Sequence, residues 1–324
     1  MKKIITGIFA ILILSLSISG FFYQNYGFTD SEKVKNVTII LKTQNDDYWK
    51  SVRRGANAAA KEFNVKVDFM APDDENDING QINLVGQAID RGTDAIILAP
   101  IDYNQLKKIT QKAIDKNIPV VAIDSKVNVS GITSFIATDN INAGKRAGEK
   151  LIELVGKNAR IAIVNLPPDI INAKEREEGL KTVLLKYPEI SVVEEEYDSS
   201  GIKGAYEITK EIIKNNGIID GIITLDSKCS IGVAQAIDEM GLSGRIKLVA
   251  FDSTTEEIEF LEKGIIQSTV TQIPFSMGYL GVKNTVLKLQ GKKIPKYIDT
   301  KLAVIDGKDM YLPENQRILF PFIQ

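Results

Sequence analysis

The sequence of 324 residues contains no histidine and only one cysteine, Cys229. The lack of histidine excludes a histidine base, a Ser–His catalytic pair and a histidine metal site. A single cysteine cannot form an intramolecular disulfide or a zinc cluster, so we interpret Cys229 as a small helix-packing residue, with a reactive thiol as the alternative. The net charge of −2 gives no electrostatic basis for binding nucleic acid. We therefore expect no metal, no cofactor and no nucleic-acid partner.

Sequence motifs of common catalytic sites are also missing. No G-x-G-x-x-G follows the first predicted strand, and neither G-x-x-x-x-G-K-[ST] nor G-x-S-x-G occurs. Pairs of aspartates could serve a glycosidase, but binding sites use such pairs equally. The sequence thus predicts a binding protein rather than an enzyme.

The N-terminus carries a long apolar run, Ile4 to Phe22, which follows two lysines. Its length is near the roughly 20 residues that cross a bilayer, and the lysines would remain on the inner side. The run continues into aromatic residues, which favours an uncleaved membrane anchor over residues 1–24, followed by a tether over residues 25–36. Small residues at 17–19 leave a cleaved signal peptide open. Both interpretations place the rest of the chain outside the cytoplasm, and the lack of a cysteine directly after the run excludes lipoprotein processing.

Strand-like runs alternate with helical patterns from residue 37 to about residue 290. Runs rich in Val and Ile, such as Val37–Leu41 and Val120–Ile123, alternate with helical stretches such as Tyr48–Phe63 and Ala173–Tyr187. This alternation predicts an α/β protein with right-handed βαβ units and parallel sheets. Because a single sheet of nine or ten strands would be unusual, we expect two similar halves, the second opening at about Asn140.

A polar loop, residues 43–47, follows the first predicted strand and leads into two adjacent aromatics, Tyr48 and Trp49. In an open α/β sheet, ligands bind beyond the carboxyl ends of the strands. Polar groups beside flat aromatic rings suit a sugar, which has hydroxyls on its rim and apolar C–H faces. The alternative is that both rings only pack the first helix.

Aspartates also follow several of the predicted strands: Asp46, Asp124, Asp139, Asp226 and Asp252. One such aspartate usually caps the next helix. If the two halves face each other, however, these carboxylates line one crevice. There they can accept charge-assisted hydrogen bonds from hydroxyl groups.

Seven segments carry a family resemblance: Thr43–Trp49, Gly92–Pro100, Asn117–Asp124, Ala137–Asn140, Ala173–Gly179, Val249–Asp252 and Thr269–Gln272. Together and in order, they resemble the type I periplasmic binding proteins of the ribose/xylose-binding family. The resemblance implies two Rossmann-like lobes with parallel sheets, joined by a hinge of three crossovers, with a sugar between them. It implies an N-terminal lobe of residues 37–139 and 273–300, and a C-terminal lobe of residues 140–272 and 301–324.

The resemblance also implies a set of ligand-binding residues: Asp46, Tyr48, Trp49, Asp124, Ser125, Asn140, Lys174, Asp226, Asp252 and Gln272. Ser125 stands where the family has the arginine of an Asp–Arg pair, and Lys174 replaces a second arginine. Asp46 and Asp226 replace asparagines. The swap of an arginine for a lysine is not conservative, and Lys174 could instead be a solvated surface residue. The site favours a neutral polyol, a pentose with xylose slightly ahead of ribose, while its excess of acid leaves an amino sugar or other cationic ligand open.

Two functions remain open. An anchored protein resembles xylose-binding proteins that report a monosaccharide to a LytS-type sensor histidine kinase. The alternative is the substrate-binding component of a sugar ABC transporter, with a permease as its partner, for ribose, another sugar or an amino sugar. The anchor-like run and the missing lipidation cysteine favour sensing.

Overall fold

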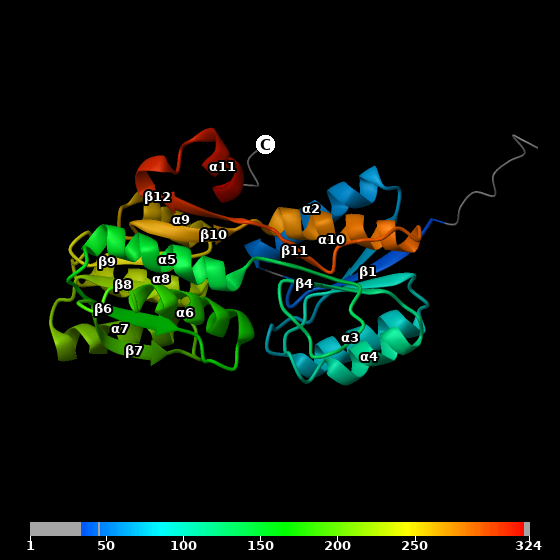
Figure 1. Cartoon of the computed structure of the whole chain (residues 1–324), viewed down its shortest axis with the longest axis horizontal. Coiled ribbons are helices and arrows are strands. Elements are labelled where there is room, and N and C mark those ends of the chain that lie inside the picture. Colours follow the sequence, from blue (N-terminus) through cyan, green and yellow to red (C-terminus); the bar gives the residue numbers. More distant parts are fainter. Residues whose placement is uncertain (1–33, 45, 321–324) are drawn as a thin grey trace, which may run out of the picture.

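The computed structural model describes residues 34–44 and 46–320. The predicted anchor, Ile4 to Phe22, and most of the tether lie outside the described residues. Within these two ranges, no helix is both long and apolar enough to cross a membrane. Figure 1 shows the described chain as two lobes arranged along the long axis of the molecule.

The first lobe is built on a six-stranded sheet in the order β11-β5-β4-β3-β1-β2, and all of its paired strands are parallel. Its strands are β1 (Asn36–Ile40), β2 (Lys66–Met70), β3 (Ala95–Leu98), β4 (Val120–Ile123), β5 (Ser134–Ala137) and β11 (Tyr297–Asp299). Neighbouring residues of β1 point to opposite faces, because side chains alternate along a strand. Ile39 packs under the helices α2 (Asp47–Glu62) and α10 (Pro274–Leu289), whereas Ile40 packs under α3 (Ile78–Asp90) and α4 (Lys107–Asp115).

The second lobe repeats this plan with the strand order β12-β10-β9-β8-β6-β7. Its strands are β6 (Arg160–Asn165), β7 (Ser191–Tyr197), β8 (Gly221–Thr224), β9 (Lys247–Phe251), β10 (Ser268–Gln272) and β12 (Leu302–Asp306). Only β12 runs antiparallel to its neighbour among these described strands. Apolar side chains of α5 (Asn140–Val155) and α6 (Ile171–Leu184) cover one face of the sheet. The other face is covered by α7 (Ile202–Asn216), α8 (Ser227–Glu239), α9 (Thr255–Glu262) and α11 (Pro313–Leu319).

The structure confirms the predicted α/β fold of two lobes with mostly parallel sheets. It differs from the sequence-based expectation in some element boundaries and at the C-terminus. Helix α8 begins at Ser227 because the Asp226 side chain accepts a hydrogen bond from the Lys228 N–H at 2.8 Å and caps the helix. Beyond residue 290 the chain forms β11, β12 and α11, which the predicted alternation did not include.

The chain passes between the two sheets after β5, after β10 and between β11 and β12. Hydrogen bonds of buried side chains tie these crossovers to one another. Thr138 donates from Oγ1 to Gln272 Oε1 at 2.9 Å, and its Oγ1 lies 3.3 Å from the hydroxyl of Thr300. A change in the angle between the lobes would therefore move all three segments together.

Candidate functional site

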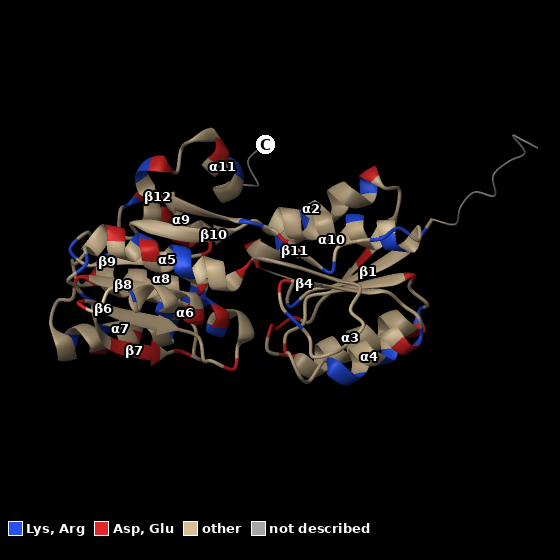
Figure 2. Cartoon of the chain, in the orientation of Figure 1, with Lys and Arg blue, Asp and Glu red and all other residues tan. Residues whose placement is uncertain are grey.

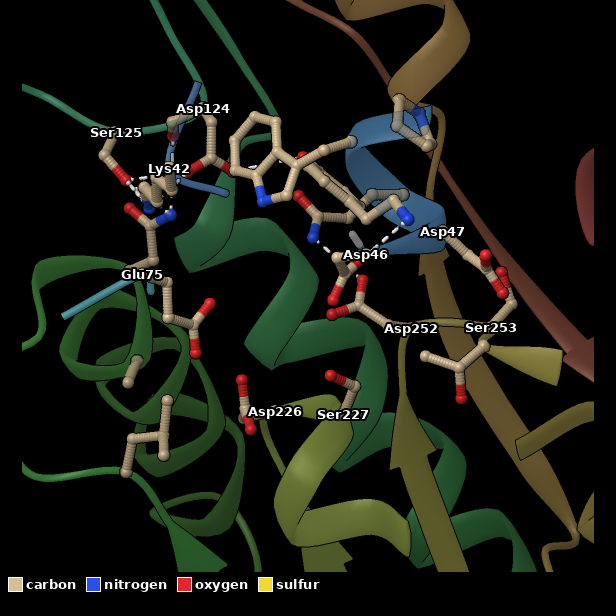
Figure 3. A pocket seen from close by; sticks show the side chains of 18 of the residues that line it. Lys42, Asp46, Asp47, Glu75, Asp124, Ser125, Asp226, Ser227, Asp252 and Ser253 are labelled. Atoms are coloured by element: carbon tan, nitrogen blue, oxygen red, sulfur yellow. Dashed lines mark hydrogen bonds and ion pairs between the residues drawn. The ribbon is translucent and has the colours of Figure 1, made fainter. Parts of the chain in front are cut away.

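A cavity of about 800 Å³ lies between the lobes, where the carboxyl ends of strands from both sheets meet. It lies where open α/β sheets bind ligands, in the crevice beyond the strand ends. Eight of the ten predicted site residues line it: Asp46, Tyr48, Trp49, Asp124, Ser125, Asp226, Asp252 and Gln272. Asn140 and Lys174 are not part of the lining. Figure 3 shows the side chains that extend into the cavity.

Asp124 is the centre of a hydrogen-bonded network on the first lobe. It follows β4 with a φ of 64°, a left-handed conformation that aspartate tolerates better than most residues. Its Oδ2 lies 2.6 Å from Lys42 Nζ and accepts from the Ser125 hydroxyl at 2.8 Å, while Oδ1 accepts from the Tyr48 hydroxyl at 3.0 Å. Burial raises the pKa of Asp124, but the charge and hydrogen bond of Lys42, together with Ser125 and the charge of Arg176, outweigh burial, so the pKa lies below its usual value. The charge of Asp124 is therefore balanced by Lys42, and both of its carboxylate oxygens accept hydrogen bonds from the protein.

Lys42 lies two residues beyond the end of β1 and lines the cavity, although it is not among the predicted site residues. Its Nζ also donates to Ser125 Oγ at 2.8 Å and lies 5.9 Å from the centre of the Trp49 ring. Lys42 thus places a cation beside Asp124, although Ser125 stands where the resemblance implies an arginine. The signal for it was a charged residue at the end of a buried strand, next to the polar loop.

Tyr48 and Trp49 both line the cavity and pack with the core of the first lobe. Their rings meet edge to face, with centroids 4.9 Å apart. Trp49 is only 4% exposed and belongs to the core of the first lobe, yet both rings line the cavity. Asp46 caps the same helix by accepting from the Tyr48 N–H at 2.7 Å, and burial raises its pKa. The start of α2 therefore presents a rigid aromatic surface beside a carboxylate.

The second lobe contributes Asp226 and Asp252, which follow β8 and β9. Asp252 has a φ of 77° and accepts at Oδ1 from the Gln272 side-chain amide at 2.8 Å. Burial raises the pKa of Asp252 to about 6; the charge of Arg176 opposes this rise, and Asp226 and Asp46 add to it. Burial also raises the pKa of Asp226. These carboxylates are therefore less well compensated than Asp124.

Arg176, rather than Lys174, is the residue of α6 that lines the cavity. Lys174 is exposed to solvent and lies outside the lining, which corrects the expectation that it reaches the crevice. The signal was helical spacing, because Ala173, Arg176 and Leu180 share the buried face of the helix and Lys174 does not. Arg176, two positions beyond Lys174, therefore brings a buried guanidinium to the cavity in place of the expected lysine.

The guanidinium of Arg176 is held on three sides. Its Cζ lies 3.8 Å from the centre of the Phe251 ring. Its Nε donates to Asn140 Oδ1 at 2.9 Å, and Nη1 donates to the Leu225 carbonyl at 2.8 Å. The predicted site residue Asn140 thus lies behind the cavity and orients Arg176. Helices α5 and α6 meet backbone to backbone here, because a Cβ on Gly144 would lie 1.7 Å from the carbonyl oxygen of Arg176. We conclude that Arg176 is fixed before any ligand arrives.

Hydrogen bonds and ion pairs join the lobes around the cavity. Asn172 on α6 donates to Ser125 Oγ at 3.1 Å, and Thr255 on α9 donates to Asp47 Oδ2 at 3.2 Å. Ion pairs link Lys126 to Glu175 and Lys228 to Glu75. Figure 2 shows that acidic and basic residues are otherwise mixed over both lobes. These contacts hold the lobes together around the cavity.

Residues 37–293 match the model of a family described as "Periplasmic binding protein domain". The chain belongs to this family. The D-allose-binding periplasmic protein of Escherichia coli K12 is 26% identical over 83% of this chain and 89% of its own length. The ribose import binding protein of Haemophilus influenzae is 23% identical over 94% of this chain and 99% of its own.

A solved structure gives the same result. An ABC transporter solute-binding protein from Agrobacterium vitis with bound D-fucose superposes with a TM-score of 0.82, at 30% identity over 88% of this chain and 100% of that chain. These comparisons confirm the resemblance to type I periplasmic sugar-binding proteins of the ribose-binding family. Their names refer to allose, ribose and fucose, to import and to ABC transport, and so give no support to xylose or to a sensor kinase.

Proposed function

We propose that the protein binds a monosaccharide between its lobes outside the cytoplasm and delivers it to an ABC permease. The observation that carries the proposal is the cavity between the two sheets, with aromatic rings on one side and carboxylates on both. Its volume of about 800 Å³ is within the range of small-molecule sites. The relatives named above for sugar binding and import favour transport over sensing. The cavity holds a ligand and carries out no chemistry on it.

A thermal-shift screen of the full chain across pentoses, hexoses and amino sugars tests the binding. A sugar that binds only the folded state raises the midpoint of unfolding, and calorimetry then gives its dissociation constant. Asp252→Ala should weaken that sugar about 10- to 100-fold, because it loses charge-assisted hydrogen bonds of about 1.5–3 kcal/mol. Lys174→Met is the matched control and should bind as the unchanged protein does. The proposal fails if no sugar shifts the midpoint.

Delivery to a permease requires a second experiment. The sugar-loaded protein should stimulate ATP hydrolysis by a sugar ABC transporter of the same organism, reconstituted in lipid vesicles. A protein without sugar should stimulate it less. Loaded protein that leaves the ATPase rate unchanged would argue against transport.

Reporting to a LytS-type sensor histidine kinase is the second candidate, carried by the apolar run Ile4 to Phe22. An anchored receptor cannot diffuse freely, so its partner must lie within reach of the tether, about 40 Å for 12 extended residues. Fractionation of cells that express the full chain separates the two. Full-length protein in the membrane favours sensing, whereas a shortened soluble product that begins near Gly20 favours a diffusing transport receptor.

A further inference from the structure

The inner surface of the cavity carries more negative than positive charge. Four carboxylates of its inner lining, those of Asp46, Asp124, Asp226 and Asp252, face two cations, Lys42 and Arg176. Lys42 lies 2.6 Å from Asp124, so this ion pair is self-contained. Arg176 lowers the pKa values of Asp226 and Asp252, and Lys228 at the rim lowers those of Asp46 and Asp226.

The positive charges at the rim are shared with carboxylates of the rim. Lys228 lowers the pKa values of Asp46 and Asp226, but its ion-pair partner Glu75 raises that of Asp46. Lys228 is paired with Glu75, and Lys126 is paired with Glu175. Asp47 is paired with Lys50 at 2.9 Å. Each of these positive charges is therefore matched by a carboxylate of its own.

Arg176 compensates the inner carboxylates only in part. Among the described residues, its hydrogen bonds go to Asn140 and to the Leu225 carbonyl, and not to a carboxylate. Its charge lowers the pKa values of Asp226 and Asp252, yet burial outweighs this effect and both stay raised. Burial of these carboxylates costs solvation free energy, which the cations of the site offset only in part.

The three carboxylates have acceptor capacity left for a ligand. Asp46 and Asp226 accept from the backbone N–H groups of Tyr48 and Lys228, and Asp252 accepts from the amide of Gln272. All three donors are neutral, and an ionised carboxylate has about four lone-pair positions. Figure 3 shows these side chains directed into the same cavity. They suit a ligand that brings both hydroxyl donors and a positive charge.

We propose that the ligand is an amino-bearing polyol of the amino-sugar class, with its ammonium group on the side of the cavity formed by Asp46, Asp226 and Asp252. This inference rests on the proposed function and specifies its substrate class. The hydroxylated part of the ligand lies against Trp49 and the Lys42–Asp124 pair. An ammonium group offers three donors and a full positive charge, so it satisfies the carboxylates that a neutral sugar leaves uncompensated.

The proposal predicts a pH dependence that involves Asp252. Charged and titratable groups face this residue from several elements: Asp46 before α2, Arg176 on α6, Asp226 before α8 and Glu257 on α9. At pH 7.5 Asp252 is ionised and attracts the ammonium group. Below about pH 6 it takes up a proton, so the affinity for an amino sugar should fall, and the affinity for a neutral sugar should change less.

Calorimetry of the full chain at pH 7.5 with matched pairs of ligands tests the proposal. The pairs are D-glucosamine with D-glucose and D-galactosamine with D-galactose. At least one amine should bind tenfold or more tightly than its parent sugar. The double variant Asp46→Asn/Asp226→Asn should reduce this preference at least tenfold. Since Asn caps helices as well as Asp does, both helix starts should remain intact, and the unfolding midpoint reports whether they do.

Asp139→Asn is the matched control, because Asp139 caps α5 in the same way but lies outside the cavity lining. It should leave the preference unchanged. Two outcomes overturn the inference alone: a parent sugar that binds as tightly as its amine, or heat from Ca²⁺ alone that the double variant abolishes. If neither the amines nor any neutral sugar binds, the inference and the proposed function both fail.

Discussion

The two lobes share one architecture but face the cavity with different electrostatics. On the first lobe, Asp124 is bound by Lys42, Ser125 and Tyr48, and its pKa lies below the usual value. On the second lobe, Asp252 accepts from Gln272, and its pKa is raised to about 6. Both aspartates follow a buried strand and both have a positive φ. The backbone position is thus the same, and the neighbouring cation makes the difference.

This difference separates a preformed surface from a responsive one. The first lobe presents a packed aromatic pair and the Lys42–Asp124 ion pair, and Asp46 is its one carboxylate in this comparison whose pKa burial raises. The second lobe keeps carboxylates whose burial is only partly compensated, and a bound donor or cation relieves that cost. Removal of Trp49 or Lys42 should therefore lower stability most, whereas removal of Asp252 should mainly weaken binding.

Truncation of Trp49 should give the largest effect on stability. Its side chain is 4% exposed and packs in the core of the first lobe, so Trp49→Ala should lower the free energy of unfolding by about 3–5 kcal/mol. Asp252→Ala, on the second lobe, should weaken sugar binding without a loss of this size. Denaturant unfolding followed by circular dichroism measures both. Equal stability losses would show that the lobes do not differ in this way.

Loss of Lys42 should give the next largest effect, because it leaves Asp124 buried without its cation. Lys42→Met should cost about 3 kcal/mol of unfolding free energy at pH 7, the lower end of the range for breaking a buried pair. The additional change Asp124→Asn should restore part of this loss. Lys50→Met is the control; its pair with Asp47 is exposed and should contribute less than about 1 kcal/mol. A Lys42→Met protein as stable as this control would contradict the proposed role of Lys42.

The sequence predicted the positions of Asp124 and Asp252 but not the cations beside them. Runs of β-branched residues that end in Asp predicted both strand ends, because the pattern is local. The neighbouring cation was missed twice, since Lys42 reaches Asp124 from another strand and Arg176 lies two positions beyond Lys174. The resemblance pointed to positions 125 and 174, where this chain carries Ser and an exposed Lys. Such contacts depend on how elements pack, which a local pattern does not contain.

Most of the fold could be predicted because its pattern is local. The prediction failed at strands that pair with a strand far away in the sequence. Alternating strands and helices each bury a face of their own, so the pattern is written within each element. Strand β11 has only three residues and pairs with β5, far back in the chain. Strand β12 is held antiparallel at the sheet edge by β10. Neither carries enough local periodicity to be distinguished from a loop.

The opposite pKa shifts of the two aspartates give opposite pH dependences. The folded protein binds more protons at Asp252 than the unfolded chain between about pH 4 and pH 6, so stability is lost as the pH rises through this window. Asp252→Asn removes that loss and should make the empty protein more stable at pH 7, by at most about 3 kcal/mol, with no difference below pH 4.

The lowered pKa of Asp124 gives stability the reverse pH dependence, since the contribution of Asp124 is present at neutral pH and is lost as the pH falls. Asp124→Asn should accordingly destabilise the protein at pH 7. Urea unfolding from about pH 2.5 to 7.5 tests both signs, because the contribution of Asp124 is lost only below about pH 4. A shift of the same sign in both variants at pH 7 would refute the contrast.

The hinge should show the smallest effect, because it belongs to both lobes. Thr138→Val removes the hydroxyl that donates to Gln272 Oε1 and meets Thr300. All three residues are buried, and an unpaired buried acceptor costs about 1 kcal/mol or more. Gln272 also donates to Asp252, so the variant should weaken ligand binding a few-fold through the second lobe and leave the Lys42–Asp124 pair unchanged.

Thr182→Val is the matched control, because its hydroxyl donates to the Glu178 carbonyl on an exposed helix face. Fluorescence of Trp49, the single tryptophan, reports unfolding of the first lobe, and calorimetry reports binding. If Thr138→Val matches Thr182→Val in both measurements, the hydrogen bonds of the crossovers do not couple the hinge to the site.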